Sequence, residues 1–171
     1  LVMPLHPAAY RNHHTQTFET YGPDVGADVP MTVEATRALQ PMLNAFGTNP
    51  TFRLVVFTMD ENIYGRELGP LAGFYPSLYV GVPWWFIDAP DAIKRFRKAL
   101  TEPVGFTKTS GFSDEPRAFL SITARHDLPR RTDSAPLTDL GLSPPPEEAA
   151  RVQSLRAIDA SRPPAVVPLY R

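Results

Sequence analysis

The sequence predicts an α/β fold, because short buried strands alternate with helices along most of the chain. The strands are predicted from four apolar runs rich in β-branched or aromatic residues: Leu1–His6, Phe52–Thr58, Leu78–Val82 and, more weakly, Gly105–Phe112. Their hydrophobicity is continuous rather than alternating, which is typical of parallel strands that are covered on both faces. Strands that alternate with helices indicate right-handed parallel crossovers.

Helices are expected at residues 31–47, 59–73 and 89–105, and in a last segment after residue 118. The first has an apolar stripe, but Pro41 is expected to kink or split it. The second is weaker because glycines and a proline interrupt it. The third is the clearest, with Pro90 in its first turn. The last is expected to break at Pro129.

Polar or aromatic side chains follow directly after the ends of the predicted strands. They are His6 and Arg11, Asp60 and Glu61, Trp84 and Trp85, and Asp114 and Arg117. Four β/α units are half of a (β/α)₈ barrel of the TIM-barrel type, in which catalytic residues lie at the carboxyl ends of the strands. They are also most of an open doubly wound sheet, but the glycine-rich phosphate-binding fingerprints are absent. We expect residues 1–135 to form the last four units of a barrel, and the proline-rich residues 136–171 to form an irregular tail.

Composition excludes several classes of function. The 171 residues include 17 Lys and Arg against 18 Asp and Glu, a formal net charge of −1. No strong field therefore attracts nucleic acid or an anionic membrane. The chain contains no cysteine, which excludes disulfides and thiolate metal sites. No apolar run approaches the roughly 20 residues of a membrane-spanning helix, so we expect a cytoplasmic protein.

Two motifs carry candidate site residues before the last strand. In "LHPAAYRNHH", His6 can bind a metal, relay a proton or hold a sugar hydroxyl, or it is an ordinary loop histidine. The adjacent His13 and His14 are interpreted as loop or capping residues. In "VPWWFIDAP", alternation along a strand would turn one tryptophan toward the helices and the other toward the barrel mouth, where it can stack on a sugar. Two core tryptophans are the alternative.

The motif "SDEPR" places carboxylates and a guanidinium close together in the sequence, where they could act on a metal or a substrate. An acid at the end of a last barrel strand can bind a divalent metal or move a proton. Arg117 can form a two-pronged contact with a substrate carboxylate. A surface ion pair on a turn is the alternative reading.

Three segments together resemble uronate isomerase (glucuronate isomerase), a family of the amidohydrolase superfamily. They are "LHPAAYRNHHTQTFETYGPDVGADVP", "FRLVVFTMDENIYGRELGPLAGFYPSLYVGVPWWFIDAP" and "GFSDEPRAFLSITARHDLPRR". The resemblance runs in uninterrupted order from about residue 1 to 133. It rests on a histidine with an arginine five residues on, "GPD" followed by "D-x-P", the double tryptophan, and the acid–arginine pair before "AFLS".

The resemblance implies a metal-assisted aldose–ketose isomerisation of D-glucuronate to D-fructuronate, and of D-galacturonate to D-tagaturonate. It implies a divalent metal, with zinc expected, bound by a first-strand H-x-H pair and an eighth-strand acid. Only the acid has a counterpart here, as Asp114, with Glu115 as its competitor. His6 and Arg11 match the fifth-strand histidine and its partner arginine.

The resemblance further implies that Trp84 or Trp85 lies beside the substrate and that Arg117 is the eighth-strand arginine. The first four strands have no counterpart, so we expect this fragment alone to be inactive. Two alternatives remain: a metal-dependent hydrolase of the same superfamily, and a non-catalytic half-barrel that is stable only as a homo-oligomer or with its missing half.

Overall fold

The computed structural model describes residues 1–25, 27–110 and 119–139. A parallel sheet lies at the centre, in the order β1–β4–β5, formed by β1 (Val2–Leu5), β4 (Arg53–Val56) and β5 (Leu78–Val80). Val2 pairs with Arg53, and Leu54 pairs with Leu78. Three of the predicted strands and their parallel arrangement are therefore confirmed.

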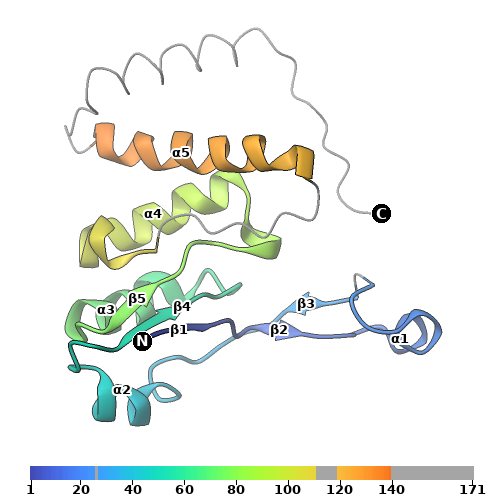
Figure 1. Cartoon of the computed structure of the whole chain (residues 1–171), viewed down its shortest axis with the longest axis horizontal. Helices are drawn as coiled ribbons and strands as arrows, with labels where there is room; N and C mark the ends of the chain where they lie inside the picture. The colour runs from blue at the N-terminus through green and yellow to red at the C-terminus, as the bar shows by residue number, and fades with distance from the viewer. Residues whose placement is uncertain (26, 111–118, 140–171) are drawn as a thin grey trace, which may run out of the picture.

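Helices lie on both sides of this sheet in successive layers (Figure 1). The helices are α2 (Gln40–Phe46), a π-helical turn η1 (Tyr64–Leu68) leading into α3 (Gly69–Phe74), α4 (Pro90–Val104) and α5 (Ile122–Asp139). α3 contacts β5, α4 contacts α3, and α5 contacts α4. α2 lies beyond the opposite side of the sheet (Figure 1).

The core is one cluster of buried side chains to which β4, β5, α2, η1, α3 and α4 all contribute. Leu54, Leu78, Leu100 and Phe96 are fully buried there. The ring of Phe96 meets the ring of Tyr64 edge to face, with 4.9 Å between their centroids, which is a favoured aromatic geometry. Burial of these large side chains fixes α4 against the turn that follows β4.

Proline positions changed two of the predicted helices. Residues 31–47 do not form one helix: 36–38 form a turn and α2 begins at Gln40, which places Pro41 in the first turn, where its missing N–H costs no hydrogen bond. The predicted break at Pro129 is wrong, because α5 continues through it to Asp139. α5 also crosses the boundary expected at residue 135.

The predicted strand Gly105–Phe112 is largely wrong within the described residues. Phe106–Lys108 form a 3₁₀ turn. A single parallel bridge joins Thr109 to Val80, and the Ser110 amide donates to the Val80 carbonyl at 2.9 Å. Glycine at 105 has a φ of 73°, a left-handed conformation that ends α4 and interrupts any extended run.

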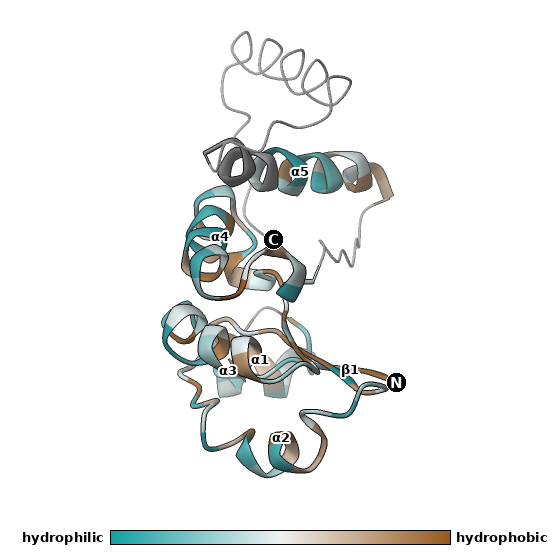
Figure 2. Ribbon diagram, turned by 90° about the vertical axis from the view of Figure 1, so that its left-hand side faces the viewer, coloured by the Kyte–Doolittle hydropathy of each residue, from teal (hydrophilic) through white to brown (hydrophobic). Residues whose placement is uncertain are grey.

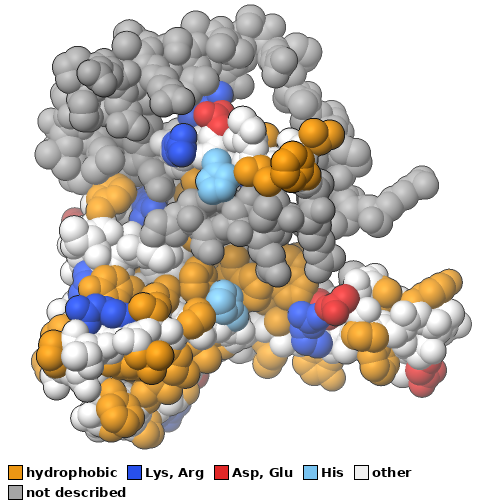
Figure 3. All heavy atoms as spheres, in the orientation of Figure 1, with side chains coloured by type: hydrophobic (Ala, Val, Ile, Leu, Met, Phe, Trp, Pro, Cys, Tyr) orange, Lys and Arg blue, Asp and Glu red, His pale blue; other side chains and the backbone are white. Residues whose placement is uncertain are grey.

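An arm that the sequence did not predict extends from the sheet (Figure 1). It consists of the antiparallel strands β2 (Ala9–Tyr10) and β3 (Val29–Pro30) and the helix α1 (Thr15–Tyr21) at its far end. His14 caps α1 by accepting a bond from the Thr17 amide at 3.3 Å, which confirms its interpretation as a capping residue. Hydrophobic side chains gather over the arm and over the sheet on the face drawn in Figure 3.

β1 is hydrophobic but exposed. It is drawn in brown up to the N-terminus in Figure 2, and the side chains of Leu1 and Val2 are 88% and 65% exposed. Among the described residues β1 has only β4 as a neighbour. The expectation that the strands are covered on both faces is therefore wrong for β1. In β4 and β5 buried residues alternate with half-buried ones, so one face of these strands is buried and the other is only partly covered. None of the described helices is long and apolar enough to cross a bilayer.

Candidate functional site

Aromatic rings from three separate segments meet at the carboxyl end of the sheet. His6 follows β1 directly, and Phe57 follows β4 directly. Their rings stack, with centroids 4.3 Å apart and planes 7° apart. Trp84, from the segment after β5, meets the His6 ring edge-on at 4.8 Å. Parallel strands bring their carboxyl ends to one edge, so residues far apart in sequence become neighbours here.

The two tryptophans lie side by side rather than on opposite faces. Trp84 has an extended backbone, but Trp85 has a φ of 55° and begins a 3₁₀ turn, Trp85–Ile87. Their ring centroids are 5.4 Å apart. The expectation from strand alternation is wrong, because β5 ends at Val80 and the pair lies in a turn. A left-handed φ is unusual for a bulky residue and marks backbone strain of a kind that clusters at functional sites.

Arg11 directly follows β2 on the arm and completes the cluster. Its guanidinium carbon lies 5.3 Å from the centroid of the Trp85 ring, within the range of a cation–π contact. Its Nε lies 3.0 Å from the buried carboxylate of Asp28, and its Nη2 contacts the exposed carboxylate of Asp24. The structure therefore brings four of the predicted site residues together: His6, Trp84, Trp85 and Arg11.

The position of the His6 ring depends on a glycine. A Cβ atom on Gly81 would lie 2.3 Å from the Phe57 ring, a distance that no side chain can occupy. The ring of Phe57 therefore lies directly over the main chain of Gly81 and supports His6 from beneath. Sequence reasoning missed both residues, although Gly81 stands directly after a predicted buried strand, where a glycine signals close approach.

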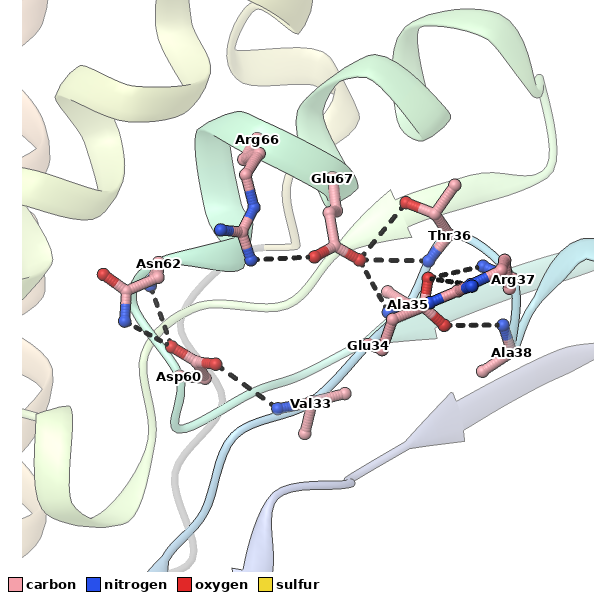
Figure 4. A network of polar contacts seen from close by, with 10 residues as sticks. All are labelled: Val33, Glu34, Ala35, Thr36, Arg37, Ala38, Asp60, Asn62, Arg66 and Glu67. Atoms are coloured by element: carbon pink, nitrogen blue, oxygen red, sulfur yellow. Dashed lines mark hydrogen bonds and ion pairs between the residues drawn. The ribbon is translucent and has the colours of Figure 1, made fainter.

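Carboxylates hold the segment that leads from the arm to α2 (Figure 4). Asp60, after β4, accepts a bond from the Val33 amide at 3.3 Å and one from the Asn62 amide at 3.0 Å. Glu67, on η1, accepts from the amides of Ala35 at 2.7 Å and Thr36 at 3.0 Å. Asp60, one of the polar residues expected at the end of β4, thus has structural partners.

Two buried groups on η1 have shifted pKa values. Burial raises the pKa of Glu67, but the bonds from Ala35, Thr36 and Arg66 outweigh it and hold that pKa below its ordinary value. Burial raises the pKa of Tyr64 well above its usual range, and its hydroxyl donates to the Thr58 carbonyl at 3.2 Å. Glu67 is therefore an anion at neutral pH and Tyr64 is neutral.

A salt bridge joins the end of β4 to α4. Glu61 accepts two bonds from Arg95, both at 2.7 Å, and this pair holds the pKa of Glu61 below its ordinary value. The geometry is the two-pronged one that guanidinium and carboxylate groups favour. Glu61 is therefore used within the fold and is not a candidate for catalysis.

The acid–arginine motif lies outside the described residues. Asp114, Glu115 and Arg117 all fall in the segment 111–118, so their predicted roles stay predictions. Among the residues that are described, no group of three His, Asp or Glu side chains converges in a way that could hold a metal ion. The described residues supply a ring cluster, formed by His6, Phe57, Trp84 and Trp85, and the guanidinium of Arg11. They do not by themselves supply a metal site.

Comparison with known proteins identifies the family of this chain. A family model described as glucuronate isomerase matches residues 1–140. This chain belongs to the glucuronate isomerase family. A uronate isomerase of Cutibacterium acnes is 54% identical over 140 residues, and one of Xanthomonas campestris pv. campestris is 56% identical over the same length. Each match covers 82% of this chain but 30% of the relative.

Solved structures of the same family have the same fold. The glucuronate isomerase of Caulobacter crescentus is 42% identical with a TM-score of 0.80, covering 96% of this chain and 36% of that one. The uronate isomerase of Thermotoga maritima is 28% identical with a TM-score of 0.75, covering 88% of this chain and 34% of that one. The chain therefore spans about a third of the length of the family members that it matches.

Proposed function

We propose that this chain is part of a uronate isomerase that interconverts D-glucuronate and D-fructuronate, and D-galacturonate and D-tagaturonate. The observation that carries the proposal is the identity of 54–56% over 140 residues to proteins named uronate isomerase. Such identity extends through the segments that contain His6, Arg11 and the tryptophan pair. The physical arrangement of those side chains is compatible with a sugar acid.

The barrel itself is part of this proposal. β1 is hydrophobic, and its Leu1 and Val2 side chains are largely exposed. A hydrophobic strand with an open edge is a surface on which another strand pairs. We propose that the parallel sheet is one sector of a (β/α)₈ barrel and that the rest of the barrel covers β1.

Arg11, His6, Trp84 and Trp85 each have a role that their chemistry suits. Arg11 offers a planar guanidinium that can bind the carboxylate of a uronate. The tryptophans offer apolar faces for the C–H side of a sugar. His6 can hold a sugar hydroxyl or move a proton between the hydroxyl and carbonyl oxygens during isomerisation. An aldose–ketose isomerisation also moves a proton between C2 and C1, which needs a base together with groups that stabilise an enediol-like intermediate.

A divalent metal, with zinc expected, is proposed for the complete enzyme, with Asp114 as the ligand from this chain. The described residues do not fit a metal by themselves, so the roles given above are limited to side chains of the ring cluster and to Arg11. The acid in question is either Asp114 or Glu115. Replacing each in turn by its amide, Asp114→Asn and Glu115→Gln, identifies the ligand as the one whose loss lowers bound zinc.

The proposal is tested by incubating the full-length protein with D-glucuronate and following the ketose by ¹H NMR. We expect turnover that is lost on chelation and restored by zinc. Arg11→Lys is expected to lower kcat/KM by roughly 30-fold or more, because the compact charge of an ammonium replaces a planar guanidinium with several hydrogen-bond donors. Arg37→Lys is the matched control, since that side chain is 87% exposed and, among the described residues, forms an ion pair only with the neighbouring Glu34.

Failure of the full-length protein to convert either aldose would refute the proposed activity. Turnover that is unchanged in Arg11→Lys would remove Arg11 from the site while leaving the activity intact. Hydrolysis of an ester or amide substrate without any isomerisation would instead support a hydrolase of the same superfamily.

A further inference from the structure

Asp28 is a buried carboxylate next to the candidate site. It directly precedes β3 on the arm, and its side chain is 4% exposed. One of its oxygens accepts a hydrogen bond from the Asn12 amide at 2.8 Å, and the other lies 3.0 Å from Nε of Arg11. Burial of a carboxylate is costly unless it is paired. Both of its partners are consecutive residues just after β2, so Asp28 holds the main chain and the side chain of this turn together.

Asp24 contacts the same guanidinium, but its carboxylate is exposed to solvent. Its side chain is 59% exposed, and it contacts Nη2 of Arg11. An exposed ion pair is weakened by water and salt, and it contributes little to fixing a side chain. Asp28 is buried and so is shielded from water and salt, which makes its attraction for Arg11 stronger. The two carboxylates thus differ in burial while sharing one arginine.

The guanidinium of Arg11 is held from two directions. Asp28 holds the Nε side, and the Trp85 ring lies 5.3 Å from the guanidinium carbon. Within the described part of the chain, Nη1 of Arg11 has no hydrogen-bond partner. Arginine has many rotamers, and a side chain that is ordered before binding loses less freedom when the ligand arrives. Because Nε and Nη2 already contact Asp28 and Asp24, Nη1 is the nitrogen left to donate to a ligand.

We propose that Asp28 is a positioning residue for Arg11, which it holds over Trp85 so that the tip of the guanidinium can bind the carboxylate of a uronate. This inference rests on the proposed function, because it assigns the ligand of Arg11 to the sugar acid. It adds a residue for which sequence reasoning gave no role. The signal was present in the sequence as the second aspartate of "GPDVGADVP".

The test compares Asp28→Asn with Asp24→Asn in the full-length protein. Asparagine keeps the shape of the side chain and can still accept from the Asn12 amide, but it removes the charge that attracts Arg11. We expect Asp28→Asn to raise KM for D-glucuronate by about tenfold or more with a smaller change in kcat, as for a lost binding interaction. Asp24→Asn is expected to leave KM within about twofold.

A double-mutant cycle separates positioning from general damage. If Asp28 acts through Arg11, Asp28→Asn adds little to the loss already caused by Arg11→Lys, because the two residues act as one unit. Additive losses would overturn the proposal, and so would equal KM values in the two aspartate variants. Melting temperatures of all variants show whether any loss reflects unfolding.

A second measurement needs no catalysis and so distinguishes failure of this inference from failure of the proposed function. In ¹H–¹⁵N spectra of the full-length protein, the Nε–H signal of Arg11 is assigned by its absence in Arg11→Lys. We expect this proton to exchange slowly with water in the unmodified chain and after Asp24→Asn, and to exchange at least about tenfold faster after Asp28→Asn. Rapid exchange in the unmodified chain would overturn the proposal even if Asp28→Asn failed to fold.

Discussion

Replacement of Glu67 by glutamine is expected to destabilise the fold, because this carboxylate is buried and accepts several hydrogen bonds. Glu67 is 8% exposed, and a single oxygen accepts from the Ala35 amide at 2.7 Å, the Thr36 amide at 3.0 Å and the Thr36 hydroxyl at 3.2 Å. Its other oxygen accepts from Arg66 at 3.1 Å. Glutamine keeps an acceptor for the amides but loses the negative charge.

The magnitude follows from the two strong main-chain bonds. A hydrogen bond to a charged acceptor contributes about 1.5–3 kcal/mol, and one between neutral groups about 0.5–1.5 kcal/mol. The difference of about 1 kcal/mol for each of two bonds gives a loss of about 2 kcal/mol in the free energy of unfolding. The bond from Arg66 adds little, because that side chain is 69% exposed.

Glu34→Gln is the matched control. Glu34 also accepts from two main-chain amides of the same segment, Arg37 at 2.8 Å and Ala38 at 3.2 Å, but its side chain is 43% exposed. Water replaces the lost interaction at an exposed site, so we expect a loss below about 1 kcal/mol. Urea unfolding of the 171-residue chain measures both, and a loss of 2 kcal/mol corresponds to a midpoint lower by about 1 M.

The effect of Glu67→Gln should depend on pH in one direction. The pKa of Glu67 is lower in the folded protein than its ordinary value. Its stabilising contribution is therefore fully present above about pH 5 and is lost as pH falls through the folded pKa. The difference between the unmodified chain and the variant should shrink at acid pH. A difference that is constant from pH 7 to 3, or equal losses in Glu67→Gln and Glu34→Gln, would refute this reasoning.

Two further predictions test other parts of the fold. Gly81→Ala places a methyl group 2.3 Å from the Phe57 ring, so it should displace Phe57 and the stacked His6 and lower turnover of the full-length protein at least about tenfold. Gly73→Ala, where the nearest atom is 3.5 Å away, should leave turnover within about twofold, and equal effects of the two changes would contradict this account. Lys108→Met removes an ammonium that donates to three main-chain carbonyls around the start of β5, at 2.9–3.1 Å. Urea unfolding should show a loss of about 2–3 kcal/mol, and a loss below 0.5 kcal/mol would show that water satisfies those carbonyls.

Local pattern was a sound guide where the hydrophobic run was long and uninterrupted. β4 and β5 fall within the predicted runs, and α4 begins at the predicted Pro90. Prolines within the predicted helices left two outcomes open. At Pro41 the structure has the expected split, because a turn at 36–38 precedes α2 and Pro41 lies in the first turn of that helix. At Pro129 the expected break is wrong, because α5 continues through it.

The sequence by itself determined the parallel strands, α4 and membership of the glucuronate isomerase family, because these depend on runs of residues that are contiguous in the chain. It also identified His6, Arg11 and the tryptophan pair as candidate site residues. Only the tertiary structure decided that His6 stacks on Phe57 and that Arg11 lies between Asp28 and Trp85. These partners come from different strands, turns and the arm, and local pattern does not specify the distances between them. Their contacts exist because parallel pairing brings the strand ends to one edge and because the arm folds back on itself beside that edge.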